Sequence, residues 1–220
     1  MSIESQSPKP KIPRSIVLFT GAYLLPAMAA ALWTRNGEFV FYCAVMMIQA
    51  LLVVVTHRRC GFSPRVLCGL SLWGLAHMVG GLMPVPESWP INGSIRVVYS
   101  WWIIPDHLKY DQVVHAFGFY VMVFVCWQGL IAIVRDLHPA RHWQPTFGAL
   151  LLCIAASTGF GALNEVIEFV ATLLVPETNV GGYVNTGWDL VSNLVGAISA
   201  AFWIRLAWKP PPLKQNPIHT

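Results

Sequence analysis

The stretch GALLLCIAASTGFGALNEVIEFVATLL, residues 148–174, places two acidic residues inside an apolar run long enough to cross a bilayer. A helix needs about 20 predominantly apolar residues to span the hydrocarbon core. A charged side chain at the centre of such a helix costs about 2.5–3.5 kcal/mol on insertion scales. Glu165 and Glu168 therefore indicate a membrane helix that carries a function as well as a fold.

The composition of the whole chain is that of a membrane protein. Of its 220 residues, 55% are hydrophobic and 11% are charged, and the mean hydropathy is +0.56. Soluble domains contain roughly 25% charged residues. The net charge of +4 could suit nucleic acid, but the basic residues flank apolar runs, where they set membrane topology. We therefore expect membrane lipid, and no nucleic acid, as the partner of this chain.

The apolar runs predict an all-α, polytopic bundle of six transmembrane helices in a single domain, residues 14–208. The predicted spans are 14–33, 37–56, 64–83, 112–134, 148–174 and 186–208. Eleven of the fourteen Lys and Arg residues then fall on the side of the two termini; the other three are Arg35, Arg96 and Lys109. Because basic residues accumulate on the cytoplasmic side, both termini are predicted to be cytoplasmic.

Two polar ends and one long loop complete the predicted organisation. Residues 1–13 and 209–220 contain prolines and few apolar side chains, and we expect them to be disordered cytoplasmic segments. Residues 84–110 form an extracytoplasmic loop rich in Trp and Tyr, which settle at membrane–water interfaces. This loop is either a lid over a site or an aromatic belt that anchors the neighbouring helices.

With this topology, ionisable residues from four spans fall in the outer half of the bilayer. Asp111 and His115 are related by i,i+4, and Glu165 and Glu168 by i,i+3, so each pair shares one helix face. Helical bundles build metal sites from inward-facing carboxylates and histidines at such spacings. Mixed oxygen and nitrogen donors suit a divalent zinc, manganese or iron ion.

This constellation defines the predicted site. The expected metal ligands are His77, Asp111, His115 and Glu168. The expected catalytic residues are Glu165 and Asp189, of which Glu165 could act as a general base.

Some of these residues have purely structural alternatives. His77 could donate to a backbone carbonyl of a neighbouring helix. Asp111 could be an interfacial acid near a helix start, where the helix dipole favours negative charge. Asp189 could belong to a capping box in the sequence Thr186-Gly-Trp-Asp189. The two glutamates have no capping role in the middle of a span.

Three segments resemble the YjdF-like family of bacterial multipass inner-membrane proteins of unknown function. They are KYDQVVHAFGFY (109–120), ALNEVIEF (162–169) and NTGWDLVSNLVGA (185–197), which match that family's D-x-x-x-H, E-x-x-E and W-D-x-x-x-N patterns. The likeness covers roughly residues 70–200. A looser similarity to VanZ-like proteins, which are linked to glycopeptide resistance, follows a related order of polar residues. The resemblance implies a bacterial inner-membrane protein and supplies no activity.

Three functions are compatible with these patterns. The first is a metal-dependent, membrane-embedded hydrolase or transferase that acts on a lipid or lipid-linked headgroup at the outer leaflet. The second is an ion- or proton-coupled transporter, because intramembrane acids and histidines also form relays. The third is a non-catalytic membrane partner protein in which polar contacts only lock helices together.

Overall fold

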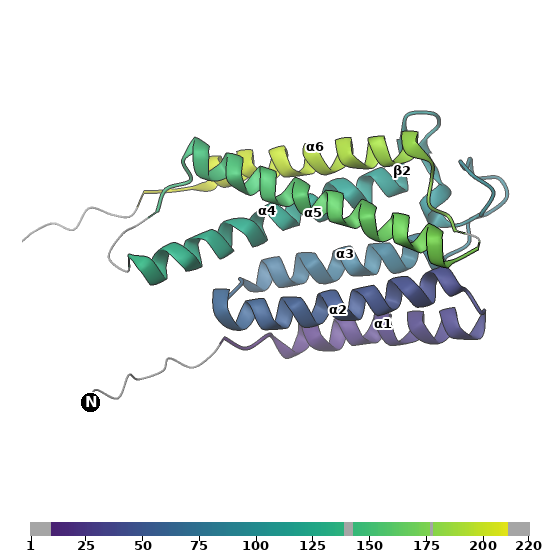
Figure 1. The fold of residues 1–220 in the computed structure, drawn as a ribbon, viewed down its shortest axis with the longest axis horizontal. Coiled ribbons are helices and arrows are strands. Elements are labelled where there is room, and N and C mark those ends of the chain that lie inside the picture. The colour runs from purple at the N-terminus through teal and green to yellow at the C-terminus, as the bar shows by residue number, and fades with distance from the viewer. Residues whose placement is uncertain (1–9, 139–142, 177, 211–220) are drawn as a thin grey trace, which may run out of the picture.

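The computed structural model describes residues 10–138, 143–176 and 178–210. Within these ranges, six helices are long and apolar enough to cross a membrane, which confirms the predicted six-helix bundle. The helices, drawn in Figure 1, are α1 (Arg14–Trp33), α2 (Gly37–Cys60), α3 (Pro64–Leu82), α4 (Tyr110–Leu137), α5 (Phe147–Leu174) and α6 (Tyr183–Ala207). The predicted disorder of residues 1–13 and 209–220 concerns 1–9 and 211–220, which lie outside the described residues.

The helix ends are set by local signals that hydropathy alone does not show. The Asn36 side chain accepts a hydrogen bond from the backbone N–H of Phe39 and caps α2. The same helix continues four residues beyond its predicted end, to Cys60, because Gly61 adopts a left-handed conformation with φ of 69° that closes the last turn. At its start, α6 begins three residues earlier than predicted.

The bundle has two layers, one made of α1, α2 and α3 and the other of α4, α5 and α6 (Figure 1). Helix α3 packs against α4 and joins the layers. Within the second layer α4 and α6 are in close contact, since a side chain on Gly196 would collide with the backbone carbonyl oxygen of Ala116. Small residues permit this kind of approach between membrane helices.

The chain starts α1 and finishes α6 at the same end of the bundle, here called the terminal end (Figure 1). The opposite end, here called the loop end, carries residues 83–109. This loop contains a 3₁₀ helix, η1 (Val98–Ser100), and an antiparallel hairpin of β1 (Trp102–Ile104) and β2 (Leu108–Lys109). The hairpin is a small addition to the predicted all-α architecture.

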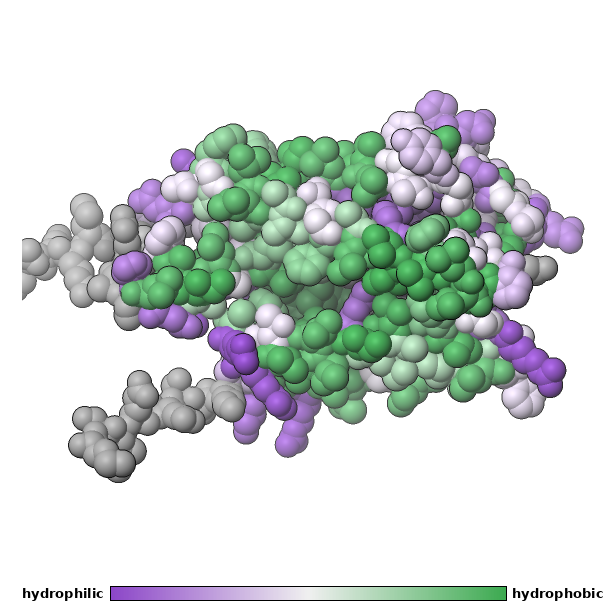
Figure 2. All heavy atoms as spheres, in the orientation of Figure 1, coloured by the Kyte–Doolittle hydropathy of each residue, from purple (hydrophilic) through white to green (hydrophobic). Residues whose placement is uncertain are grey.

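Large apolar side chains cover the outside of the helices, as Figure 2 shows for one face. Leu18, Leu51 and Phe202, for example, are all more than 60% exposed. In a soluble protein such a surface would aggregate. Here it is the surface that meets lipid.

Candidate functional site

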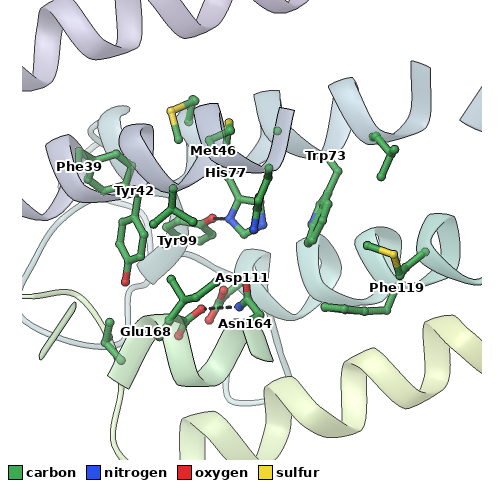
Figure 3. Close-up of a pocket in the computed structure, with 18 of the residues that line it drawn as sticks. Phe39, Tyr42, Met46, Trp73, His77, Tyr99, Asp111, Phe119, Asn164 and Glu168 are labelled. Carbon is green, nitrogen blue, oxygen red and sulfur yellow. Dashed lines mark hydrogen bonds between the residues drawn. The ribbon is translucent and has the colours of Figure 1, made fainter. Parts of the chain in front are cut away.

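A cavity of about 1190 Å³ lies between the two layers. Its walls come from α1, α2 and α3 on one side and from α4, α5 and the start of α6 on the other, and residues of the loop end also line it. Figure 2 shows a hollow between the layers with a polar patch inside an apolar face. Three predicted site residues, His77, Asp111 and Glu168, line this cavity, and Figure 3 shows them facing the same space.

His115 lies at the centre of the predicted constellation. Its side chain is 2% exposed, and its Nδ1 atom lies 3.0 Å from Asn193 Oδ1. An amide oxygen can only accept, so Nδ1 must carry the ring proton and donate it. The other ring nitrogen, Nε2, is then unprotonated in the neutral ring and is free to ligate a metal. A histidine ligand is typically oriented by this kind of hydrogen bond from its second nitrogen.

Carboxylates from three helices surround the imidazole ring. His115 Nε2 lies 3.5 Å from Asp111 Oδ1 and 3.9 Å from Glu168 Oε1, and Nδ1 lies 3.8 Å from Glu165 Oε1. Two groups have potential ligand atoms within 4.8 Å of one another: Asp111, His115 and Asp189, and His115, Glu165 and Glu168. The structure thus brings together five of the six predicted site residues, namely His115 and the four acids around it.

Several buried polar atoms of this cluster have no hydrogen-bond partner among the described residues. They are both carboxylate oxygens of Glu165, Oδ1 of Asp189 and Nδ2 of Asn193. Asp189 is fully buried. An unpaired buried carboxylate oxygen is costly, because it loses its hydration without replacement. A cation bound in the cluster would supply the missing partner of the carboxylate oxygens, so the residues present fit a divalent metal.

The sequence patterns did not identify two residues that contact the cluster, Lys109 and Asn185. Lys109 is buried, its Nζ lies 3.8 Å from Asp111 Oδ2, and it donates a hydrogen bond to Asn185 Oδ1. Asn185 Nδ2 donates in turn to Asp189 Oδ2 over 2.6 Å. Lys109 precedes the first residue of α4, so its position at the helix start was the only signal that could have placed it beside Asp111.

Glu168 also has a local partner that was not predicted. Asn164 Nδ2 donates to Glu168 Oε1 over 2.9 Å, one helical turn away on α5. This bond holds the carboxylate toward the cavity, as the dashed line in Figure 3 shows. Because Oε2 stays outside this bond, the carboxylate keeps an oxygen for a ligand.

His77 belongs to neither of the two ligand groups. Its Nδ1 is hydrogen-bonded to the hydroxyl of Tyr99, and its ring meets Trp73 edge to face at 5.1 Å between centroids. Burial, followed by the nearby Asp111 carboxylate, raises the pKa of Tyr99 well above its usual value, so its hydroxyl keeps its proton. The loop residue Tyr99 therefore packs into the bundle and orients His77.

The structural alternatives for the two aspartates have different outcomes. Asp111 does lie in the first turn of α4, where the dipole favours an acid, yet its side chain is 17% exposed and faces His115. The proposed capping box of Asp189 is absent within the described residues, because α6 begins at Tyr183 and Gly182 is its N-cap. Asp189 is therefore in the interior of α6, and its buried carboxylate faces the cluster.

Comparisons with known proteins identify a family. The family described as "Predicted membrane protein (DUF2238)" matches residues 15–209, nearly the whole chain, and the chain belongs to it. This agrees with the predicted YjdF-like resemblance, while the looser VanZ-like similarity stays a prediction. An uncharacterized protein of Thermotoga maritima is 26% identical over 108 residues, which cover 46% of this chain and 53% of the relative. The chain thus spans about half the length of that relative. No solved structure matches the chain.

Proposed function

We propose that this DUF2238 member is a metal-dependent, membrane-embedded hydrolase or transferase that acts on a lipid or lipid-linked headgroup. The observation that carries the proposal is the position of the buried cluster around His115. It lies beside one end of a cavity whose remaining walls are mostly apolar and belong to membrane-spanning helices. An amphiphile fits such a space with its polar end at the cluster.

The charge of the cluster supports a bound cation. Four carboxylates, Asp111, Glu165, Glu168 and Asp189, surround His115, and one buried ammonium group, that of Lys109, lies 3.8 Å from Asp111. With a neutral His115, four negative charges and one positive charge give a formal charge of −3. Burying uncompensated charge costs several kcal/mol per ion even after relaxation. A divalent zinc, manganese or iron ion would reduce that cost.

The residues divide into ligands and catalytic groups. His115, which both ligand groups share, would hold the metal through Nε2, together with Asp111 of one group and Glu168 of the other. The bound metal would supply an activated water and polarise a phosphoryl or acyl oxygen. Glu165, with two unpaired oxygens, is the general base that accepts the proton of the attacking water. Asp189, held by Asn185, would accept that proton from Glu165 and pass it to the leaving oxygen.

The predicted role of His77 as a fourth ligand is less compatible with its hydrogen bond. If Tyr99 donates to Nδ1, the proton of the neutral imidazole lies on Nε2, which then donates and cannot ligate. We therefore assign His77 to substrate binding, as a hydrogen-bond donor into the cavity. The distribution of basic residues and the family resemblance support the bacterial inner membrane as its location, with the cluster in the outer half.

Metal analysis of the detergent-purified protein tests the proposal. We expect stoichiometric metal in the wild type and its loss in Glu168→Gln and in His115→Ala, with Glu87→Gln in the exposed loop as the matched acid control. A wild type that remains free of metal after incubation with zinc, manganese or iron contradicts the metal site. With metal present, incubation in vesicles and mass spectrometry of the lipids would identify the altered headgroup.

A carrier is the second candidate, because the cavity does not stop at the cluster. Polar side chains, Thr20, Gln49 and Ser71, line it farther toward the terminal end. A relay or an ion path needs polar groups at that depth. Uptake of protons or metal ions into vesicles, abolished by Gln49→Leu while bound metal is retained, would favour the carrier over the enzyme.

A further inference from the structure

The part of the cavity beyond the cluster forms an apolar groove along α2. Its floor and sides include Val45, Met46 and Val53 of α2 and Met122 and Val125 of α4. Protein interiors seldom contain empty apolar space of this size, because unfilled volume forfeits dispersion contacts. In a membrane the neighbouring material that can fill such a groove is hydrocarbon.

The groove opens sideways between α2 and α5. Leu52 on α2 and Phe160 and Leu163 on α5 line the cavity and are also 48–58% exposed on the apolar surface of the bundle. Residues of this kind mark the rim of an opening rather than the inside of a closed void. Figure 2 shows the hollow at this face, between the two layers.

The length of the groove gives the size of its occupant. From Tyr42, beside the cluster, the lining residues of α2 continue to Thr56, near the terminal end. Fourteen residues of helix rise about 21 Å, whereas half of a bilayer's hydrocarbon core is about 15 Å. The groove therefore passes the bilayer midplane, and it can hold one extended long acyl or isoprenoid chain.

We infer that the groove is a binding site for one hydrocarbon chain of a membrane lipid, which enters between α2 and α5 with its headgroup at the His115 cluster. This inference rests on the proposed function for the identity of the polar end. The groove itself can be tested without any catalytic activity. A helix from a second copy of this chain is the competing occupant, and it would exclude lipid.

Two matched pairs of variants probe the opening. Val45 lines the groove, whereas Val55 lies on the same helix, is 47% exposed and lies outside the lining, so Val45→Trp should fill the groove and Val55→Trp should not. On α5, Leu163→Trp and Leu151→Trp form the second pair, since Leu151 is 51% exposed and also lies outside the lining. The second pair serves if Val45→Trp does not yield folded protein.

The measurement is photo-crosslinking in vesicles of phosphatidylethanolamine and phosphatidylglycerol. The probe is phosphatidylglycerol with a diazirine at the end of one acyl chain, and mass spectrometry locates the labels. We expect labels on Val53 and Val125 in the wild type, reduced about tenfold in Val45→Trp, a factor equivalent to about 1.4 kcal/mol, and unchanged in Val55→Trp. Equal labelling of the two variants, or no label on these residues in the wild type, overturns the inference.

Glu168→Gln separates the groove from the proposed chemistry. Because the acyl chain contacts no ligand residue, we expect labels on Val53 to persist in this variant while metal is lost. Labels that depend on Val45 in a protein that binds no metal would support the groove and refute the metal site. Metal binding without such labels would refute the groove alone.

Discussion

The two layers of the bundle differ in what they contain. The α4–α6 layer supplies Asp111, His115, Glu165, Glu168 and Asp189, and it is packed closely enough for Gly196 to touch the backbone of α4. The α1–α3 layer supplies only His77 among the predicted site residues, and it gives the cavity most of its apolar wall. The polar cluster thus belongs to one layer, and most of the apolar cavity wall belongs to the other. The polar cluster needs rigid, close neighbours, whereas a hydrocarbon site needs a wall that leaves room.

The largest effect on the polar cluster is expected when α4 and α6 are forced apart. Gly196→Ala would place Cβ against the carbonyl oxygen of Ala116, a backbone atom that cannot rotate away. Overpacking costs about 1–3 kcal/mol or more, so we expect a marked fall in melting temperature in detergent and loss of bound metal. Gly187→Ala in the same helix, where nothing lies within 4 Å, is the matched control. Equal melting temperatures for the two variants would contradict the close contact.

A smaller effect is expected when a hydrogen bond of the cluster is removed and the helix packing around it is kept. Asn193→Ala removes the acceptor that holds the Nδ1 proton of His115. Loss of such an orienting partner typically weakens metal binding about 10–100-fold, and we expect that range in a chelator competition assay. Ser192→Ala, next to it on α6 and half-buried, should bind metal as the wild type does. An unchanged affinity in Asn193→Ala would mean that His115 is not a ligand through Nε2.

The contact between the loop and the first layer should respond to alkaline pH. The pKa of Tyr99 is raised in the folded protein, mainly by burial, so ionising its hydroxyl costs more there than in the unfolded chain. The stability that this group contributes is present below the unfolded-state pKa of about 10 and is lost as pH rises toward the folded-state pKa. Tyr99→Phe should therefore reduce the loss of stability above that pH.

At neutral pH the same variant should cost about 1 kcal/mol, the net value of one hydrogen bond. Tyr183→Phe, at a side chain that is 92% exposed, is the control. Thermal unfolding of the three proteins across the alkaline range gives both results. Parallel pH profiles for the wild type and Tyr99→Phe would show that the hydroxyl is not buried against His77.

The smallest effect is expected in the α1–α3 layer. Gln49→Leu keeps the side-chain volume of a groove-lining residue and removes its amide. An enzyme with a hydrocarbon groove should lose neither metal nor stability, within about 0.5 kcal/mol, the usual range for changes away from packed contacts. Metal content and melting temperature are the measurements. Loss of metal would show that the polar cluster extends into the first layer.

The fold could be predicted almost completely from the sequence. Apolar length and basic flanks predict the six spans because lipid offers the backbone no hydrogen bonds and leaves the helix as the available structure. The boundary errors of a few residues, as at Cys60 and Tyr183, arise where a left-handed glycine or an early N-cap extends a helix past its apolar run. The hairpin of β1 and β2 lies outside the membrane, where hydropathy gives no signal.

The sequence predicted which residues of the candidate site share a helix face and lie at a similar depth in the membrane. Helical spacing places Asp111 with His115 and Glu165 with Glu168, because i,i+3 and i,i+4 residues share a face. It could not show that Lys109 and Asn185 join the cluster, since their contacts cross between α4 and α6. Nor could it separate His77 from the ligand groups, because that depends on Tyr99 reaching in from the loop.

The sequence by itself determined that this chain crosses a membrane six times and that its acids and histidines lie at a similar depth, toward the loop end of the bundle. Those properties follow from the free energy of transferring each side chain from water to lipid and from the periodicity of the helix, and both can be read from the order of the residues. Only the tertiary structure decided that Asp189 and Asn193 meet His115, that the oxygens of Glu165 are left without a hydrogen bond, and that a groove runs along α2. Such features depend on how helices pack, and packing distances are set by side chains far apart in the sequence.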